Sequence, residues 1–471
     1  MQTRDIVVIG GGPAGYVAAV RAAQLGVSVT LVEERELGGT CLNRGCIPTK
    51  TLVDTAKMIG HIPDGKKRGV VYSGTYEIDM KAALNYKNRL VRRMSAGIGV
   101  LLREHGVEVL SGCGTVSDGL DGLVVNVSNG EAVRAKKIIV ATGTNPIRLP
   151  IPGFHDSRVL TTDNVLNLDF VPKRLAVLGA GVAGVEFSQI FKTFGSEVHI
   201  IEALDRVCPF LDAELSRALE KSCLEKKIKC SLGTKLEKIE SHDENLVLHL
   251  SDGQTLEVTH LLSAVGRAPD CRAVESLNLK QQREYVVVND WFQSSHPDIY
   301  VPGDLNGSCM LAHAAYRMGE IAADHAVASL KNESPEDIPK FCTTCVPGAI
   351  YTDPEVGYVG LTEEKAKEKH ENIMIGRFPL AANGRATVAG TPEGFVKAIA
   401  SSKTEKIVGV HIFGLYASEL VNEAAVAVTL GLTIGEWSKV IHAHPTVSES
   451  LAEAAADAKF LSLHLPPKKT V

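Results

Sequence analysis

The chain has no run of 18 or more consecutive apolar residues, the shortest length that typically spans a bilayer as a helix. Low-complexity tracts and long blocks of like charge are also missing. The 45% apolar and 22% charged residues are typical of a folded globular chain and argue against a disordered, fibrous or coiled-coil protein. A net charge of −5 argues against nucleic acid as the main partner.

Cysteine is sparse, with 10 residues in 471, which is too few for a framework of structural disulfides. We therefore expect a reducing compartment, the cytoplasm, and expect a close cysteine pair to serve in catalysis. The chain enters an apolar stretch at Ile6, and we therefore expect no signal or transit peptide. At about 150 residues per domain, the length predicts about three domains.

The strongest feature of the sequence is an ungapped internal repeat. Positions 5–33 read DIVVIGGGPAGYVAAVRAAQLGVSVTLVE, and positions 174–202 read RLAVLGAGVAGVEFSQIFKTFGSEVHIIE. Each copy predicts an apolar strand, a glycine turn, a helix rich in small residues and a second strand that ends in glutamate. Positions 169 apart match, which pairs Gly10 with Gly179, Gly12 with Gly181, Gly15 with Gly184 and Glu33 with Glu202.

This spacing is typical of a dinucleotide-binding fold. The first glycine permits a tight turn, the second lets the backbone approach a pyrophosphate, and the third allows the helix to pack closely on the strand. The helix amino terminus favours the negative charge of the pyrophosphate, and the terminal glutamate accepts hydroxyls of an adenosine ribose. Because the unit occurs twice, we expect two dinucleotides.

The second glutamate also predicts which nicotinamide cofactor binds. A carboxylate at Glu202 repels a 2′-phosphate, so it favours NAD over NADP. Arg206 lies four residues further on and would weaken this preference. The alternative for Arg206 is a solvated charge in a loop.

Two cysteines follow the first repeat, in GGTCLNRGCIPTK at positions 38–50. Cys41 and Cys46 are five residues apart, and an ideal helix would separate their Cα atoms by at least about 7.5 Å along its axis. A disulfide needs about 4.4–6.8 Å, so a bonded pair requires a distorted segment, for which Gly45 supplies the freedom. Such a disulfide would be strained and reducible. The alternative is two unrelated buried thiols. We expect the next helix to begin at Pro48.

On these motifs the chain resembles the pyridine nucleotide–disulfide oxidoreductases, from Asp5 to about Ala458. The resemblance implies an α/β fold with two Rossmann-like dinucleotide-binding domains, one inserted in the other, and a C-terminal α+β interface or dimerisation domain. It implies FAD and NAD as cofactors. The implied boundaries are 1–147 for the first part of the FAD-binding domain, 148–272 for the NAD-binding domain, 273–342 for the return to the FAD or central domain, and 343–471 for the interface domain.

The resemblance assigns roles to four residues around the thiols. Cys41 would be the interchange thiol that attacks the substrate, and Cys46 would be the charge-transfer thiol against the flavin ring. Lys50 resembles a lysine near flavin N5 and would pair with Glu186, the last residue of GAGVAGVE. Both are charged residues within apolar sequence, where an unpaired charge would be costly.

A second implied pair lies near the carboxyl end, in IHAHPTVSESLAEA. By resemblance, Glu449 orients the His444 imidazole, which exchanges a proton with a dithiol substrate. The second subunit would contribute this pair, which implies a homodimer with shared active sites. The alternatives are a zinc site of His442, His444 and Glu449, which no further ligand cluster supports, and a core histidine before a proline. We expect no metal.

The remaining implied site residues are places where the chain would meet the cofactors. Those implied for FAD are Gly10, Gly12, Gly15, Glu33, Lys50, Gly114, Ala141, Thr142, Gly143, Asp304, Met310, Leu311, Ala312 and His313. Those implied for NAD are Gly179, Gly181, Gly184, Glu186, Glu202, Leu236 and Gly266.

Within this family, the motifs are most similar to those of enzymes that oxidise protein-bound dihydrolipoamide with NAD⁺. Val182 stands where glutathione reductases carry a tyrosine over the flavin. The implied partner is the lipoyl domain or acyltransferase core of a 2-oxoacid dehydrogenase or glycine cleavage complex. The alternatives are an NAD(P)H-dependent reductase of glutathione-type disulfides and a non-catalytic flavin-bound subunit of a complex.

Arg44 and Thr49 depart from this pattern, Thr49 standing where many relatives have serine, and one further cysteine pair needs an interpretation. Arg44 stands between the two thiols, where many relatives have valine; it would either lower a thiol pKa or face outward. Cys342 and Cys345 form a CxxC in FCTTCVPGAIY, which is ordinarily a sign of redox chemistry or zinc. Because no second CxxC accompanies them, we interpret them as spare thiols.

Overall fold

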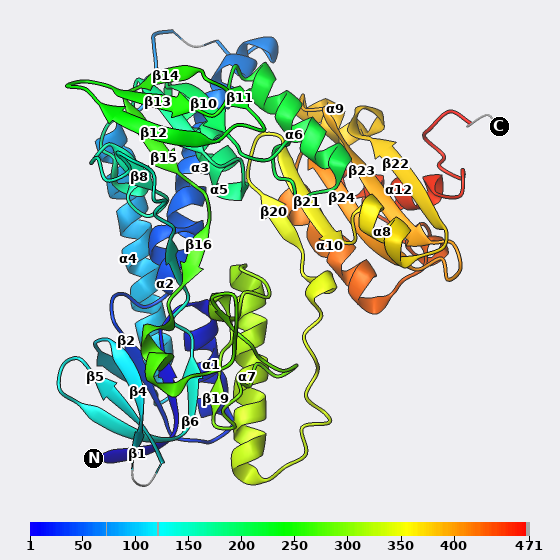
Figure 1. The fold of residues 1–471 in the computed structure, drawn as a ribbon. Coiled ribbons are helices and arrows are strands. Elements are labelled where there is room, and N and C mark those ends of the chain that lie inside the picture. The colour runs from blue at the N-terminus through cyan, green and yellow to red at the C-terminus, as the bar shows by residue number, and fades with distance from the viewer. Residues whose placement is uncertain (72, 120–121, 468–471) are drawn as a thin grey trace.

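The structure is a computed structural model that describes residues 1–71, 73–119 and 122–467. Three large sheets organise it, each with helices packed against it (Figure 1). Parallel strands dominate the first two sheets, and the third, at the carboxyl end, is antiparallel. The predicted fold class, α/β with a C-terminal α+β unit, is therefore confirmed.

The first unit is built on a mixed sheet of seven strands, in which β4, β5 and β6 form an antiparallel meander. Its strands are β1 (Gln2–Ile9), β2 (Val29–Glu33), β3 (Glu108–Ser111), β4 (Gly114–Gly119), β5 (Gly122–Val127), β6 (Ala132–Val140) and β19 (Ile299–Tyr300), and its helices are α1 (Pro13–Gln24), α2 (Gly39–Arg44), α3 (Cys46–Lys67), α4 (Met80–Glu104) and α7 (Ala312–Lys331). The order is β3-β2-β1-β6-β5-β4, with β19 added in parallel to β6. Because Ile6, Val7 and Val8 in β1 are fully buried, the centre of the sheet is covered on both faces.

The second unit is a five-stranded parallel sheet in the order β11-β10-β9-β15-β8. Its elements are β8 (Val159–Thr161), β9 (Arg174–Leu178), α5 (Val182–Phe194), β10 (Glu197–Ile201), α6 (Ala213–Glu225), β11 (Lys229–Ser231) and β15 (His260–Ser263). An antiparallel sheet of β12 (Leu236–Ser241), β13 (Leu246–Leu250) and β14 (Thr255–Val258) lies between β11 and β15 in sequence.

The chain enters and leaves the second unit through one pair of strands. β7 (Thr144–Pro146) leads out of the first unit, β16 (Arg267–Pro269) leads back, and the two pair antiparallel, with Asn145 opposite Ala268. The chain then passes η2 (Cys271–Leu277), β17 (Gln281–Gln282), β18 (Tyr285–Val286) and η3 (Asp304–Asn306). Since β19 rejoins the first sheet, the second unit is inserted in the first. The residue boundaries of the domains stay predictions.

The third unit is an antiparallel sheet in the order β20-β21-β24-β23-β22. It follows a linker, residues 332–347, that runs from the end of α7 to β20 and contains the short turn η4 (Thr343–Cys345) (Figure 1). Its elements are β20 (Gly348–Ile350), β21 (Glu355–Gly360), α8 (Glu363–Lys369), β22 (Ile373–Pro379), α9 (Gly384–Ala389), β23 (Gly394–Ser401), β24 (Ile407–Gly414), α10 (Ala417–Leu430), α11 (Ile434–Trp437) and α12 (Glu449–Asp457). Among the described residues, no helix has both the length and the apolar character needed to cross a bilayer.

A buried charge cluster joins the second and third units. The Nζ atom of Lys397, on β23, lies 2.9 Å from an Asp212 carboxylate oxygen and 2.7 Å from Glu363 Oε2. The Lys397 and Asp212 side chains are only 4% and 1% exposed. Burial by itself lowers the pKa of Lys397, but hydrogen bonds and charge attraction from Glu363 and Asp212 raise it overall. The lysine is therefore held as a cation beside three carboxylates, since Glu214 Oε2 also lies 3.6 Å from Nζ.

Removing this cation is expected to destabilise the protein strongly. Lys397→Met leaves a buried, unpaired carboxylate at Asp212, and breaking a buried ion pair in this way costs about 3–5 kcal/mol of unfolding free energy. The urea midpoint measures the loss. Lys238→Met is the control, because Lys238 pairs with Glu240 at a side-chain exposure of 52% and exposed pairs contribute about 0–1 kcal/mol. Equal midpoints for the two variants would contradict the prediction.

Candidate functional site

The two copies of the repeat fold into the same turn. Gly10 and Gly179 have φ angles of +99° and +103°, and a Cβ atom on them would lie 2.4 and 2.6 Å from a carbonyl oxygen of the neighbouring strand end. A Cβ atom on Gly15 or Gly184 would lie 1.8 or 1.9 Å from the carbonyl oxygen of the first glycine in the same turn. Only glycine fits these four positions without displacing backbone.

The middle glycines leave an open space at the helix amino termini. A Cβ atom on Gly181 would meet nothing within 4 Å, and one on Gly12 would meet only Gly39 Cα at 3.7 Å. Helices α1 and α5 begin directly after these glycines and carry no acidic residue in their first turns. Each turn therefore offers free space, backbone N–H groups and a positive dipole end, which fits the pyrophosphate of a dinucleotide.

Each terminal glutamate is fixed by two backbone N–H groups of its own copy, at positions again 169 apart. This pairing was not predicted, because the repeated residues Gly11 and Ala180 differ in type. The four bonds run from Gly11 to Glu33 Oε2 (2.5 Å), Arg35 to Glu33 Oε1 (2.7 Å), Ala180 to Glu202 Oε2 (2.6 Å) and Leu204 to Glu202 Oε1 (2.9 Å). Both carboxylates are thereby held beside their glycine turns, where an adenosine ribose would bind.

A cleft of about 250 Å³ connects the first glycine turn with the cysteine pair. Its lining includes nine of the residues expected to meet FAD, namely Gly10, Gly12, Glu33, Ala141, Thr142, Gly143, Asp304, Met310 and Ala312. A smaller hollow of about 70 Å³, which Glu33 also lines, includes Gly114, Asp270 and Arg272. The chain thus provides a continuous series of small residues and backbone groups from an adenosine end to the thiols, and this series fits FAD.

Three other residues expected to meet FAD have different surroundings. Gly15 packs against the glycine turn itself, and Leu311 is partly buried against the core of the first unit. His313, in the first turn of α7, donates from Nε2 to the Pro347 carbonyl oxygen at 2.7 Å. The imidazole is therefore hydrogen-bonded to the linker that leads into the third unit.

Asp304 lies at the start of η3 on the wall of the cleft. Burial raises the pKa of its carboxyl group, although a hydrogen bond from Thr144 Oγ1 at 3.3 Å opposes this shift. One carboxylate with few protein partners in a cleft is suited to accept hydroxyl groups of a ligand.

The cysteine pair sits at a break between two helices. Cys41 lies in α2, Cys46 is the first residue of α3, and Gly45 between them has φ −145° and ψ −107°. The predicted distortion at Gly45 is confirmed. The helix begins at Cys46 and not at Pro48 as predicted. Pro48 can lie in its first turn because the missing N–H of a proline has no helical partner there.

Cys41 and Cys46 are free cysteines in this structure, which does not contain the predicted disulfide between them. A hydrogen bond from Cys41 to the Cys46 sulfur lowers the pKa of Cys46, and the cation of Lys50 lowers it further against the effect of burial. The same hydrogen bond raises the pKa of Cys41. These shifts favour the proton on Cys41 and the thiolate form on Cys46, which the amino terminus of α3 also favours.

Lys50 and Glu186 form the predicted ion pair near Cys46. Lys50 Nζ lies 2.9 and 3.1 Å from the two carboxylate oxygens, and Glu186 is only 2% exposed. Burial lowers the pKa of Lys50, but Glu186 and the Cys46 sulfur raise it overall. Tyr351, which no sequence motif pointed to, donates its N–H to Glu186 at 2.9 Å and places its ring 4.7 Å from Nζ.

This arrangement predicts an alkylation profile with a low inflection for Cys46. Because the deprotonated form is favoured, the thiolate persists as the pH falls below the ordinary thiol pKa of about 8.5, until the lowered pKa is reached. Iodoacetamide labelling of the reduced holoprotein, read by peptide mass spectrometry, measures the inflection. Lys50→Met is expected to raise it, whereas Lys57→Met, on the same helix but paired with Glu355 at 2.5 Å, is expected to leave it in place. An unchanged inflection in Lys50→Met would contradict this account.

Arg44 does not place a charge between the thiols. Its guanidinium lies 2.5 Å from Glu36 Oε2 and 3.9 Å from Asp163 Oδ2. Lys50, and not Arg44, is the cation that lowers the pKa of Cys46. Neither alternative describes Arg44, because its side chain is only 21% exposed and lines the cleft while it pairs with the two carboxylates.

His444 and Glu449 also form their predicted contact. His444 Nδ1 lies 2.9 Å from Glu449 Oε1, and the Thr446 N–H donates to Glu449 Oε2 at 2.8 Å, so the carboxylate is held in one orientation. The bond leaves Nε2 of an imidazole that is 78% exposed. His444 is too exposed to be a core histidine. The zinc-site alternative does not fit either, because His442 bonds Glu423 at 2.9 Å.

Most of the residues expected to bind NAD lie at or near the second glycine turn, whereas the side chain of Leu236 packs in the core. The three glycines and Glu202 form the second turn described above, and Gly266, with φ +111°, accepts the Ile147 N–H just before β16. Leu236 begins β12 with 6% of its surface exposed and packs in the core with Ile239, which leaves only its backbone for a ligand. Arg206 donates to the Pro209 carbonyl oxygen at 3.0 Å.

The structure contains a disulfide between Cys342 and Cys345, with a Cα separation of 5.3 Å. The interpretation of these residues as spare thiols is therefore wrong. The turn η4 explains the pairing, because the Cys345 N–H donates to the Cys342 carbonyl oxygen at 3.1 Å and brings the two side chains together.

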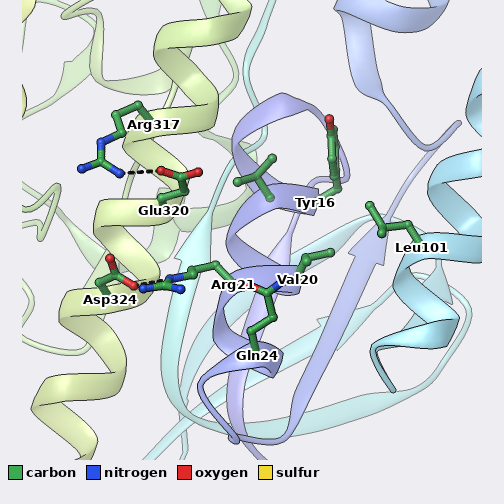
Figure 2. Close-up of a pocket in the computed structure, with 9 residues that line it drawn as sticks. Tyr16, Val20, Arg21, Gln24, Leu101, Arg317, Glu320 and Asp324 are labelled. Carbon is green, nitrogen blue, oxygen red and sulfur yellow. Dashed lines mark hydrogen bonds and ion pairs between the residues drawn. The ribbon is translucent and has the colours of Figure 1, made fainter.

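A separate hollow of about 390 Å³ in the first unit is lined by residues of α1 and α7 and by Leu101 of α4 (Figure 2). Its charged side chains pair with one another: Arg21 with Asp324 at 2.6 Å, and Arg317 with Glu320 at 2.6 Å. The hollow shares no lining residue with the cleft that contains the thiols. We assign it no part in the chemistry.

The chain is similar to known proteins over almost its full length. The chain is 34% identical to dihydrolipoyl dehydrogenase 3 of Haloarcula marismortui, over 98% of this chain and 97% of that protein. It is 35% identical to the dihydrolipoyl dehydrogenase of Bacillus subtilis, over 98% and 99%, and 36% identical to that of Thermus scotoductus, over 99% of both.

Solved structures show the same fold. LpdA from Mycobacterium tuberculosis matches with a TM-score of 0.88 at 27% identity, over 97% of this chain and 99% of that one. The HOCl-induced flavoprotein disulfide reductase RclA from Escherichia coli, in its Cu(II) complex, matches with a TM-score of 0.84 at 28% identity, over 97% and 99%. Residues 346–455 match the pyridine nucleotide-disulphide oxidoreductase dimerisation domain. Residues 4–319 match the main family domain, and the chain therefore belongs to the pyridine nucleotide-disulphide oxidoreductase family.

Proposed function

We propose that this protein oxidises protein-bound dihydrolipoamide to lipoamide and transfers the electron pair to NAD⁺, as the named activity of its full-length relatives suggests. It is an oxidoreductase with FAD and NAD as cofactors. The observation that carries the proposal is the Cys46 sulfur in the lining of the cleft, where Cys41 and the cation of Lys50 lower its pKa and so favour its thiolate form. When bound, FAD supplies the electron acceptor for this thiolate, and NAD⁺ supplies the final hydride acceptor.

The cysteines perform the disulfide exchange. In the oxidised enzyme, a substrate thiolate attacks Cys41 Sγ, the Cys41–Cys46 bond breaks, and its electron pair leaves on Cys46 as a thiolate. The second substrate thiol then loses its proton and attacks the substrate sulfur of the mixed disulfide, which closes the lipoamide ring and releases Cys41. Lys50 stabilises the leaving thiolate, and the lowered pKa of Cys46 and the raised pKa of Cys41 favour this distribution of the proton.

We further propose that His444 removes the substrate protons, and that it does so in the active site of a partner subunit. Glu449 fixes Nδ1, which leaves Nε2 free to accept a proton. The high exposure of His444 in the single chain and the dimerisation-domain match over residues 346–455 support a homodimer with shared sites. The proposed partner beyond the homodimer is a lipoyl domain of a 2-oxoacid dehydrogenase or glycine cleavage complex, and the proposed location is the cytoplasm.

A substrate comparison tests the proposal. We expect purified holoenzyme to reduce NAD⁺ with dihydrolipoamide and to show little activity with NADP⁺, because the Glu202 carboxylate repels a 2′-phosphate. Oxidised glutathione with NADH or NADPH is the parallel assay. Faster turnover of glutathione would favour the low-molecular-weight disulfide reductase, and a lack of turnover with both substrates would favour the non-catalytic flavin-bound subunit.

A further inference from the structure

The linker between the first and third units carries the disulfide of Cys342 and Cys345 in an accessible place. Cys342 is exposed and Cys345 is half-buried. The two residues between them form η4, in which Thr344 Oγ1 lies 3.5 Å from Cys342 Sγ. An attacking sulfur can therefore approach Cys342 from solvent, while Cys345 faces the protein.

The linker is held on both sides of this disulfide by contacts that do not involve the two sulfurs. On one side, the Phe341 ring packs edge-on against Phe292 at 5.6 Å. On the other side, the Pro347 carbonyl oxygen accepts from His313 at 2.7 Å. The chain is thus anchored before and after η4, so opening the disulfide leaves the two thiols close together and ready to re-form the bond.

We propose that the Cys342–Cys345 pair is a second thiol–disulfide exchange site of this protein, which takes an electron pair from small dithiols of the dihydrolipoamide class independently of Cys41 and Cys46. An exposed disulfide closed by only two intervening residues is typical of labile, exchanging pairs and not of structural ones. In a chain with few cysteines, disulfide exchange explains a bonded pair better than a structural cross-link does.

The exchange transfers one electron pair from the dithiol to the Cys342–Cys345 disulfide in two steps. One thiolate of the dithiol attacks Cys342 Sγ, the Cys342–Cys345 bond breaks, and Cys345 leaves as a thiolate that takes up a proton. The second thiol of the reductant, after losing its proton, attacks its own partner sulfur in the mixed disulfide and releases Cys342. The dithiol is oxidised to a cyclic disulfide and the protein pair is reduced to two thiols. Because the second step is intramolecular, a dithiol completes it far faster than a monothiol does.

The test uses the holoenzyme with Cys41→Ser, in which the catalytic pair cannot form a disulfide. We expect two equivalents of reduced lipoamide, added without oxygen, to yield one equivalent of lipoamide per chain and to expose Cys342 and Cys345 to N-ethylmaleimide, as read by peptide mass spectrometry. Reduced glutathione at the same thiol concentration is expected to label the pair at least about tenfold more slowly.

The matched control adds Cys342→Ser and Cys345→Ser to the same background, and FAD content verifies that each variant is folded. The control is expected to produce no lipoamide. The proposal is overturned if Cys342 and Cys345 stay unlabelled in Cys41→Ser, if the triple variant still produces lipoamide, or if glutathione labels the pair as fast as reduced lipoamide does. None of these outcomes depends on whether the wild-type enzyme turns over dihydrolipoamide, so failure of the proposed function would be seen separately.

Discussion

Replacing Cys46 with serine is expected to lower dihydrolipoamide-dependent NADH formation by about 10⁴-fold or more, while the protein keeps its FAD. A hydroxyl group cannot form the disulfide with Cys41, and it cannot hold the negative charge that Lys50 and the start of α3 stabilise at this position. Steady-state turnover and the visible flavin spectrum of the same preparation measure the two parts of the prediction.

The control for this variant is Cys230→Ser. Cys230 is a half-buried free thiol in β11 of the second unit, outside the cleft that contains the catalytic pair. We expect it to keep nearly full turnover, so that a loss in Cys46→Ser reflects the position of the sulfur and not the loss of a thiol as such. Full turnover in Cys46→Ser would show that the assignment of the catalytic pair is wrong.

Replacing His444 with glutamine is expected to lower turnover by about 10²–10⁴-fold, the usual contribution of a general base. Glutamine preserves much of the size and polarity of the side chain but cannot take up the substrate proton. Since Glu449 is already held by the Thr446 N–H, the loss is expected in the rate of turnover and not in stability. His464→Gln is the matched control, because His464 forms the same kind of exposed pair with Glu453 at 2.7 Å.

Mixed dimers test whether the two subunits share their sites. A dimer of one Cys46→Ser subunit and one His444→Gln subunit, isolated with two different affinity tags, contains one complete site if the cysteines of one subunit work with the histidine of the other. We then expect about half of the wild-type activity per dimer, although each homodimeric variant is nearly inactive. An inactive mixed dimer would mean that each subunit uses its own histidine.

The sequence alone predicted those parts of the site whose spacing is local. The glycine turns, the helix break at Gly45 and the contact of His444 with Glu449 each depend on residues within a few positions of one another. Lys50 and Glu186 were matched across 136 positions only because both belong to motifs. In contrast, Tyr351 belongs to no such motif, and its contacts with that pair are fixed by the packing of the third unit on the second.

Two other features lay outside the reach of sequence reasoning for physical reasons. Lys397 meets Asp212 across 185 positions, and neither residue stands in a pattern that marks it as buried. The bond between Cys342 and Cys345 depends on the conformation of η4, and a CxxC sequence is equally compatible with two free thiols. Leu236 shows a related difficulty, since the resemblance gave its position beside a cofactor but not the direction of its side chain.

The pairing of β7 with β16 brings together the two ends of the inserted second unit. The strands that enter and leave this unit lie side by side, and the Ile147 N–H donates to the Gly266 carbonyl oxygen at 3.1 Å where they separate. The two ends of the insert are therefore adjacent, and a tight turn of a few residues would join β7 directly to β16 if the insert were cut out. The second unit could therefore be removed or replaced without interrupting the sheet of the first unit, which β19 completes by pairing with β6.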